Sequence, residues 1–238
     1  MSLEFLSPSA SALARSPMER EALAAGAELE LRDGWNVAVR FDGADVERRR
    51  RSSTVGFTDR SHLGKIELQA EPSELARIAG PLELGRATRS GDGWWCPYTA
   101  GRALALCEPG EVGALRTRLE DAAAAAGAPA SVIDVSTAWA ALTISGPLAG
   151  ELFARFSAVD LRPQATSVHG FRPVSVARTP GAVLREGDDR YLMLFGSALG
   201  RYMWTVVADA AASLGGGPVG LDALDPLEDA LREASPHA

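Results

Sequence analysis

Four polar residues that together could contact a ligand stand where a strand pattern begins. They form the segment Asp59–His62, which has the sequence Asp-Arg-Ser-His and follows a turn that contains Gly56. From Lys65 to Leu68 polar and apolar side chains alternate, as they do in a half-buried strand. The segment is therefore expected at the entrance to a strand, where His62 either contacts a ligand or only closes the turn by hydrogen bonding.

A second candidate group combines a thiol with aromatic rings. Cys96 directly follows Trp94 and Trp95, and Tyr98 stands two residues after it. A reactive thiol needs a neighbouring base or cation to lower its pKa, and none is close in the sequence, so a buried structural cysteine is expected. The three rings either stack on a flat ligand or fill the core, and both interpretations stay open.

The 238-residue chain is acidic, with a formal net charge of −7. A surface of that sign repels a phosphate backbone, so nucleic-acid binding is not expected. One short run is strongly positive in spite of the negative net charge, because residues 48–51 are four consecutive arginines. So short a run is easily hydrated, and it is either a solvated helix end or a site for a phosphate or a partner.

Metal binding and membrane insertion are not expected either. The two cysteines, Cys96 and Cys107, form no C-x-x-C pair, and the histidines lie far apart at His62, His169 and His237. No apolar run approaches the roughly 18 residues that a membrane span requires, and no secretory signal is expected from the first residues. A cytoplasmic protein with reduced cysteines is the resulting prediction.

Helix and strand signals alternate along the chain. Asp-Gly at 33–34 predicts a hairpin turn, and Ser16-Pro17 predicts the start of a helix that ends at Gly26. An alanine run with leucines at helical spacing makes 111–126 the clearest helix. Further helices are predicted at 73–80, 148–156, 197–214 and 221–231, a helical connector at 44–53, and strands at 29–31, 37–41, 93–98, 102–107, 139–144, 171–177, 181–185 and 190–195. This order predicts an α+β fold with antiparallel sheets covered on one face by helices.

Four motifs, in this order along the chain, resemble those of a known family. They are Ser-Pro-Met at 16–18 with Gly-Ala at 26–27 and Gly-Trp at 34–35, then Gly-Phe-Thr-Asp-Arg-Ser-His at 56–62, Ala-Leu-Thr-Ile-Ser-Gly-Pro-Leu-Ala at 141–149, and Pro-Val-Gly-Leu-Asp-Ala-Leu-Asp-Pro-Leu-Glu at 218–228. The family is that of the glycine cleavage T-protein, an aminomethyltransferase, with its relative the gamma subunit of heterotetrameric sarcosine oxidase. The chain is similar to the gamma subunit in length and in its C-terminal half.

This resemblance implies a folate-binding fold of two interlocked lobes of antiparallel sheet with covering helices. Lobe A is expected to combine residues 1–58 with residues 132–231, and lobe B to comprise residues 59–131. Residues 232–238 are expected to be a disordered tail, and the C-terminal barrel domain of the T-protein is not expected. Tetrahydrofolate would lie in a cavity between the lobes.

The resemblance also implies which residues form the site. In the aminomethyltransferases one of two adjacent carboxylates orients the folate amine, and such a group also stabilises the positive charge that develops there. The corresponding positions here are Cys96 and Pro97, which cannot do this, so no catalytic residue is expected. The expected folate contacts are Asp188, Tyr191, His62, Trp95 and Tyr98.

Among these contacts, Asp188 is the candidate for the glutamate that grips the pterin ring in the family. The segment Glu186–Tyr191 resembles the motif that carries that glutamate. The same Gly-Asp-Asp composition is typical of a hairpin turn, so both interpretations stay open.

Three functions of different class agree with these patterns. The first is a non-catalytic subunit or scaffold of a one-carbon or amine-oxidising complex, with flavoprotein oxidase subunits as partners or else a homo-oligomer. The second is a tetrahydrofolate-dependent aminomethyltransferase-like enzyme. The third is a small-molecule binding module with a degenerate folate site. Tetrahydrofolate is the implied ligand, and no metal is expected.

Overall fold

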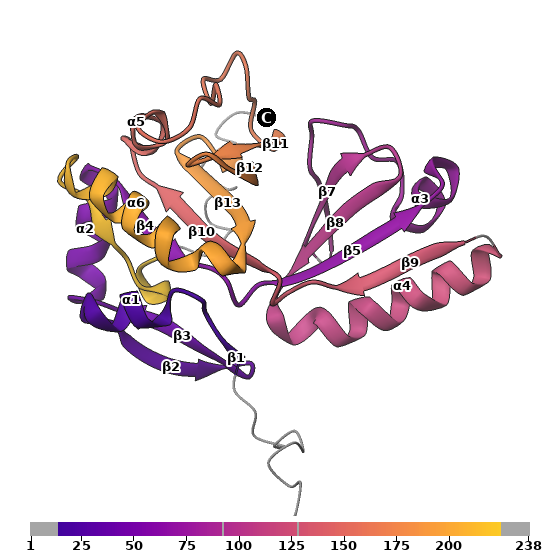
Figure 1. Cartoon of the computed structure of the whole chain (residues 1–238), viewed down its shortest axis with the longest axis horizontal. Helices are drawn as coiled ribbons and strands as arrows, with labels where there is room; N and C mark the ends of the chain where they lie inside the picture. The colour runs from indigo at the N-terminus through magenta and orange to yellow at the C-terminus, as the bar shows by residue number, and fades with distance from the viewer. Residues whose placement is uncertain (1–13, 92, 128, 225–238) are drawn as a thin grey trace, which may run out of the picture.

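The computed structural model describes residues 14–91, 93–127 and 129–224. These residues form three β-sheets with helices packed on them, which confirms the predicted α+β class (Figure 1). Most strand pairs are antiparallel, and the pairs β1–β3 and β14–β4 are parallel. The sheets are called A, B and C here, in the order in which the chain enters them.

Sheet A is the smallest, with the strand order β1-β3-β2. Its strands and the two helices beside it are β1 (Ala14–Arg15), β2 (Glu28–Arg32), β3 (Trp35–Arg40), α1 (Glu19–Ala24) and α2 (Ala44–Ser53). Asp33 and Gly34 join β2 to β3 with φ of 46° and 79°. Two positive φ values are what a tight hairpin turn requires, so the predicted turn is confirmed.

Sheet B has the strand order β11-β12-β13-β10-β4-β14. These strands are β4 (Gly56–Asp59), β10 (Trp139–Ser145), β11 (Phe171–Val176), β12 (Thr179–Gly187), β13 (Arg190–Gly196) and β14 (Gly217–Pro218). Helices α5 (Ala149–Ala154) and α6 (Gly200–Ala212) cover one face of this sheet (Figure 1). Met203 and Val207 of α6 pack there in one cluster with Met193 and Phe195 of β13.

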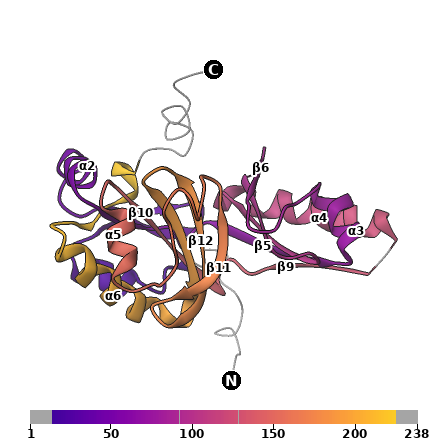
Figure 2. The ribbon, with the colours of Figure 1, turned by 90° about the horizontal axis from the view of Figure 1, so that it is seen from above.

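Sheet C has the strand order β6-β7-β8-β5-β9. Its elements are β5 (Gly64–Ala70), α3 (Pro72–Ala79), β6 (Thr88–Ser90), β7 (Gly93–Thr99), β8 (Arg102–Cys107), α4 (Val112–Ala126) and β9 (Ala130–Asp134). Helices α3 and α4 lie together along β5 and β9 (Figure 2). Leu115 and Leu119 of α4 pack against Ile66 and Leu68 of β5, as the spacing of the leucines predicts.

The other faces of sheets B and C pack against each other, and this contact layer is called the seam. Along β13 the side chains alternate, so that Leu192 and Leu194 point into the seam while Met193 points to the helices. In β7, Cys96 faces the seam and Trp95 faces α3 and α4. Strands buried on both faces explain why the sequence shows short continuous apolar runs here.

Two expectations change at the level of elements. The prediction that β5 is half-buried is wrong, because its polar residues Lys65 and Glu67 are 0% and 5% exposed. Helices cover one face of sheet C and sheet B covers the other, so β5 is buried on both faces up to Leu68, and only Gln69 and Ala70 at its end reach water. The predicted helix at 221–231 begins as a 3-10 turn over Leu221–Ala223. The rest of that helix and the predicted tail, residues 232–238, lie outside the described residues.

The chain passes between sheets B and C twice, through residues 60–63 and 135–138. Lys65, the only lysine in the sequence, holds both passages. Its Nζ donates to the carbonyl oxygens of Ser61 at 2.9 Å and Leu63 at 2.7 Å in the first, and of Ser136 at 3.3 Å in the second. The three donors of an ammonium group thereby meet three backbone acceptors.

Burial lowers the pKa of Lys65 from 10.5 to about 7, against the opposing charges of Asp59 and Asp134. The unfolded chain therefore binds one more proton than the folded chain between these two pH values. Because of that difference, the free energy of unfolding should rise with pH across this window. The contribution of this one group is at most about 1.4 kcal/mol per pH unit.

We expect this rise to disappear in the Lys65→Met variant. Urea denaturation of both proteins across the window measures it, because other titrating groups cancel in the difference. A chain labelled with isotopic lysine gives one side-chain resonance, whose titration midpoint should lie near pH 7. A midpoint close to 10.5, or equal pH slopes for the two proteins, would contradict this role of Lys65.

Candidate functional site

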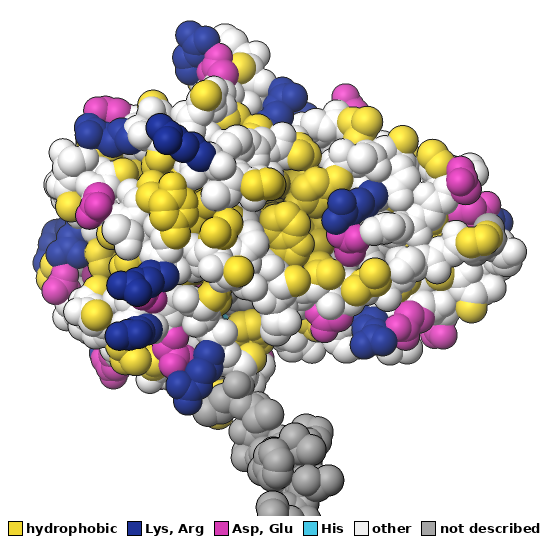
Figure 3. Space-filling model, viewed as in Figure 1, with side chains coloured by type: hydrophobic (Ala, Val, Ile, Leu, Met, Phe, Trp, Pro, Cys, Tyr) yellow, Lys and Arg dark blue, Asp and Glu magenta, His cyan; other side chains and the backbone are white. Residues whose placement is uncertain are grey.

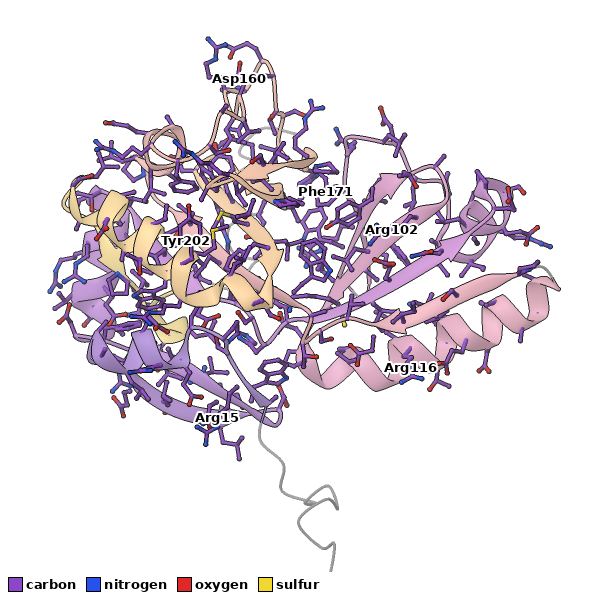
Figure 4. All side chains as sticks on the ribbon, in the orientation of Figure 1. Arg15, Arg102, Arg116, Asp160, Phe171 and Tyr202 are labelled. Atoms are coloured by element: carbon purple, nitrogen blue, oxygen red, sulfur yellow. The ribbon has the colours of Figure 1, made fainter. Side chains whose placement is uncertain are left out.

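The middle of the seam is closed by apolar side chains. Leu104 of β8, Leu184 of β12 and Leu194 of β13 are all completely buried there, together with Phe171 of β11. Figure 4 shows Phe171 where the two sheets meet, with Arg102 on the sheet C side. A ligand can therefore reach the seam only at its two ends, which differ in chemistry.

Charged groups occupy the end where β12 turns into β13. Arg190 Nε donates to Glu186 Oε2 at 2.9 Å, and these side chains are 6% and 3% exposed. Arg60 lies beside them, and its Nη2 donates to Glu108 Oε1 at 3.5 Å. Burial lowers the pKa of Arg60, which the charges of Glu186 and Glu108 oppose. The two carboxylates thus balance the two guanidinium groups.

A β-bulge aims Glu186 into this end of the seam. The pairing of β12 with β13 shifts register between Arg185 and Gly187, and Glu186 is the additional residue. Its charge also acts on the thiol of Cys96 across the seam. A buried carboxylate thus lies near the position that the resemblance assigns to a catalytic carboxylate, and the sequence analysis missed it.

The opposite end of the seam opens to the surface as a groove of about 550 Å³. Tyr98 and Trp139 contribute rings to it, 6.3 Å apart between centroids, and Arg102 and Arg178 contribute cations. Figure 3 shows apolar side chains gathered on this face where the two sheets meet. The remaining lining residues are Pro173, Val174, Ser175, Thr179, Pro180 and Gly181. This groove combines flat apolar surface with positive charge.

The structure does not bring the five predicted folate contacts together. Tyr98 lines the groove, whereas Trp95 packs against α3 and α4 on the other face of sheet C. Tyr191 packs in the cluster under α5 and α6, 5.5 Å from Phe153 between ring centroids. Asp188 lies in the turn between β12 and β13 with its side chain 77% exposed. The hairpin interpretation of Asp188 is therefore the one the geometry matches.

His62 lies in the first passage between the sheets and is 6% exposed. Burial, together with the charges of Arg60 and Lys65, lowers its pKa to about 3. The imidazole is therefore neutral at physiological pH. Its neighbour Ser61 donates its backbone N–H to Asp59 Oδ1 at 2.9 Å. The segment thus closes a turn, which is one of its two expected roles.

Cys96 and Pro97 lie in β7, and both are buried. Burial raises the pKa of the Cys96 thiol, and the charge of Glu186 adds to this effect. The thiol is therefore neutral and packed in apolar surroundings, as the sequence analysis expected for a structural cysteine. Cys107, the other cysteine, is buried too.

Two wider searches of the described residues complete this picture. Among them, no group of three or more His, Cys, Asp or Glu side chains is placed to hold a metal ion. The helices of that same part of the chain all lack either the length or the hydropathy of a membrane-spanning segment.

No family model matches the sequence. An alignment of 77 positions, which covers 28% of this chain, shows 39% identity to an aminomethyltransferase of Picosynechococcus sp. and covers 21% of that protein. Over 91% and 90% of the chain, the identity is 25% to an aminomethyltransferase of Deinococcus deserti and 26% to one of Moorella thermoacetica. The chain spans 64% and 63% of those two proteins, which is slightly less than two thirds of their length.

Two solved structures share the fold at 18% sequence identity. Aminomethyltransferase T of the glycine cleavage system from Bartonella henselae matches with a TM-score of 0.75, over 89% of this chain and 60% of that one. A chain of heterotetrameric sarcosine oxidase from Corynebacterium sp. U-96 matches with a TM-score of 0.67, over 87% of this chain and 99% of that one. Sequence and fold together confirm the resemblance to the glycine cleavage T-protein (aminomethyltransferase)-like family, whose fold this chain has.

Proposed function

We propose that this chain is a non-catalytic subunit with the T-protein-like fold, acting in a multi-subunit complex of one-carbon or amine metabolism. The chemistry at the two implied carboxylate positions is the observation that carries this proposal. Cys96 and Pro97 are buried there, and the raised pKa of the thiol keeps it neutral. A neutral thiol and a proline ring neither hold a reacting amine nor stabilise a developing positive charge.

Glu186 does not replace the missing carboxylate pair. Its Oε2 accepts from Arg190 in a buried ion pair, and its charge also offsets that of Arg60. If Glu186 moved out of this arrangement, two buried cations would lose their counter-charge, which would destabilise the folded chain. The aminomethyltransferase-like alternative needs a carboxylate that can approach a substrate nitrogen, so we do not favour it.

The groove at the open end of the seam supports binding of a folate-class molecule. Its rings, Tyr98 and Trp139, suit a flat heterocycle, and Arg178 suits a carboxylate of an acidic tail, whereas Arg102 is already paired with the buried carboxylate of Glu67. The Tyr98 hydroxyl is buried and has no hydrogen-bond partner, so a ligand that offers an acceptor after a small movement would satisfy it. Tetrahydrofolate is the ligand we propose for this groove.

Flavoprotein oxidase subunits are the partners that we propose, with a homo-oligomer as the alternative. The likeness to a chain of heterotetrameric sarcosine oxidase supports a complex of this kind. We also propose the division into lobe A (1–58 and 132–231) and lobe B (59–131), supported by the two passages at 60–63 and 135–138. A cytoplasmic location remains part of the same proposal.

The first test is enzymatic. We expect the purified chain, supplied with tetrahydrofolate and an aminomethyl donor, to give no product above the rate without protein. A single-turnover assay at high protein concentration measures this, with a complete aminomethyltransferase as the positive control. Sustained turnover by this chain would contradict the proposed loss of chemistry.

A second test separates the two ends of the seam as ligand sites. We expect Tyr98→Ala to weaken tetrahydrofolate binding about tenfold, the effect of losing a stacked ring worth roughly 1 kcal/mol or more. Asp188→Ala should leave the affinity unchanged, because the Asp188 side chain points into solvent from the turn. Isothermal titration calorimetry measures both. If Asp188→Ala weakened tetrahydrofolate binding and Tyr98→Ala did not, the ligand site would lie at the charged end and not in the groove.

The closed, charged end gives a third prediction. Glu186→Gln should lower the free energy of unfolding by about 3–5 kcal/mol, because it leaves the buried Arg190 without its counter-charge. In the exposed control pair, Arg116 Nε donates to Glu120 Oε1 at 2.8 Å, and Glu120→Gln should leave the free energy of unfolding nearly unchanged. Urea denaturation measures both variants. Equal small losses would show that the Glu186 ion pair does not close the seam.

A further inference from the structure

Three arginines gather beside strand β6 without carboxylate partners. Arg86 and Arg89 are exposed, and neither forms an ion pair within the described part of the chain. The Nη1 of Arg172 approaches Gly85, the residue before Arg86, and its Nη2 donates to the Ala165 carbonyl at 2.7 Å. The formal net charge of the whole chain is −7, and none of these three cations forms an ion pair with a carboxylate of the described residues.

Backbone pairing holds this segment against the start of β11. Ala87 N donates to the His169 carbonyl at 2.8 Å, and Phe171 N donates to the Gly85 carbonyl at 2.9 Å. Arg86 also forms a bridge to Gly170. These contacts fix His169 at φ 67°, a left-handed conformation that is uncommon for a residue with a side chain. The imidazole is thereby held next to the arginines.

Beneath the arginines lie two ring nitrogens that have no partner. The guanidinium of Arg89 is 5.7 Å from the centre of the Trp94 ring, and the His169 ring is 4.9 Å from it. Trp94 is 4% exposed, and its Nε1 and the Nε2 of His169 are both buried without a hydrogen-bond partner. Buried polar groups are rarely left unpaired, so each one needs an explanation.

We propose that Arg86, Arg89, Arg172, His169 and Trp94, called the β6 cluster, bind an oxyanion, either a carboxylate or a phosphate group. Guanidinium groups recognise the paired oxygens of such groups, and the Trp94 Nε1–H supplies a further donor, as does His169 Nε2 when it carries the proton. The cluster is separate from the groove at Tyr98, so this inference does not depend on the proposed function.

The test uses inorganic phosphate and glutarate as probes at constant ionic strength. We expect the indole N–H resonance of Trp94, assigned with Trp94→Phe, to shift saturably with at least one of them. The double variant Arg86→Gln/Arg89→Gln should weaken that binding at least tenfold. Phosphate alone, glutarate alone or both can produce the shift, which identifies the preferred oxyanion.

Arg49→Gln is the matched control, because Arg49 is an exposed arginine on α2 that makes no ion pair within the described residues. It should change the affinity less than twofold. The bound anion should also raise the pKa of His169, which burial and the charges of Arg86 and Arg89 lower in the free protein. No saturable shift with either probe, or equal weakening by the control and the double variant, would overturn the proposal.

Discussion

A single buried ammonium group, that of Lys65, holds the two places where the chain passes between sheets B and C. Its three hydrogen bonds reach carbonyls of both passages, so one side chain links the two passages. The residue type fits this position, because the lysine ammonium directs three rotatable donors from one compact point, whereas the donors of an arginine are fixed in a planar fork. The chain has 23 arginines and one lysine, and the lysine is the cation with no exposed surface.

With the two sheets held in this way, the polarity and the openness of the seam differ between its middle and its two ends. Leu104, Leu184 and Leu194 close the middle, so no ligand can pass through it. One end is sealed by the Glu186–Arg190 ion pair, and the other opens between Tyr98 and Trp139. The groove end thus presents two rings at the surface, while the positions that the resemblance assigns to the carboxylates, Cys96 and Pro97, are buried.

Much of this fold could be predicted from the sequence, because local signals decide it. Asp33-Gly34 specified a hairpin, and the leucine spacing specified the buried face of α4. The site was less predictable. Adjacent residues of a strand point to opposite faces. Cys96 therefore faces the seam, whereas Trp95, predicted as a folate contact, faces the helices on the other side of sheet C. The bulge that aims Glu186 inward comes from the pairing of β12 with β13, for which the sequence has no local signal. Lys65, the only lysine in the sequence, could have indicated a position with a special structural role.

Some charged groups of this chain are neutralised by partners within the fold, and others are open to a ligand. At the closed end of the seam Arg60 and Arg190 face Glu186 and Glu108, so this end needs no ligand to neutralise it. The β6 cluster has three exposed cations and no ion pair among the described residues, while its Trp94 ring packs in the apolar cluster of the seam. The charges at the closed end are therefore already paired, whereas the β6 cluster lies at the edge strand of sheet C. The unsatisfied ring nitrogens lie at that edge.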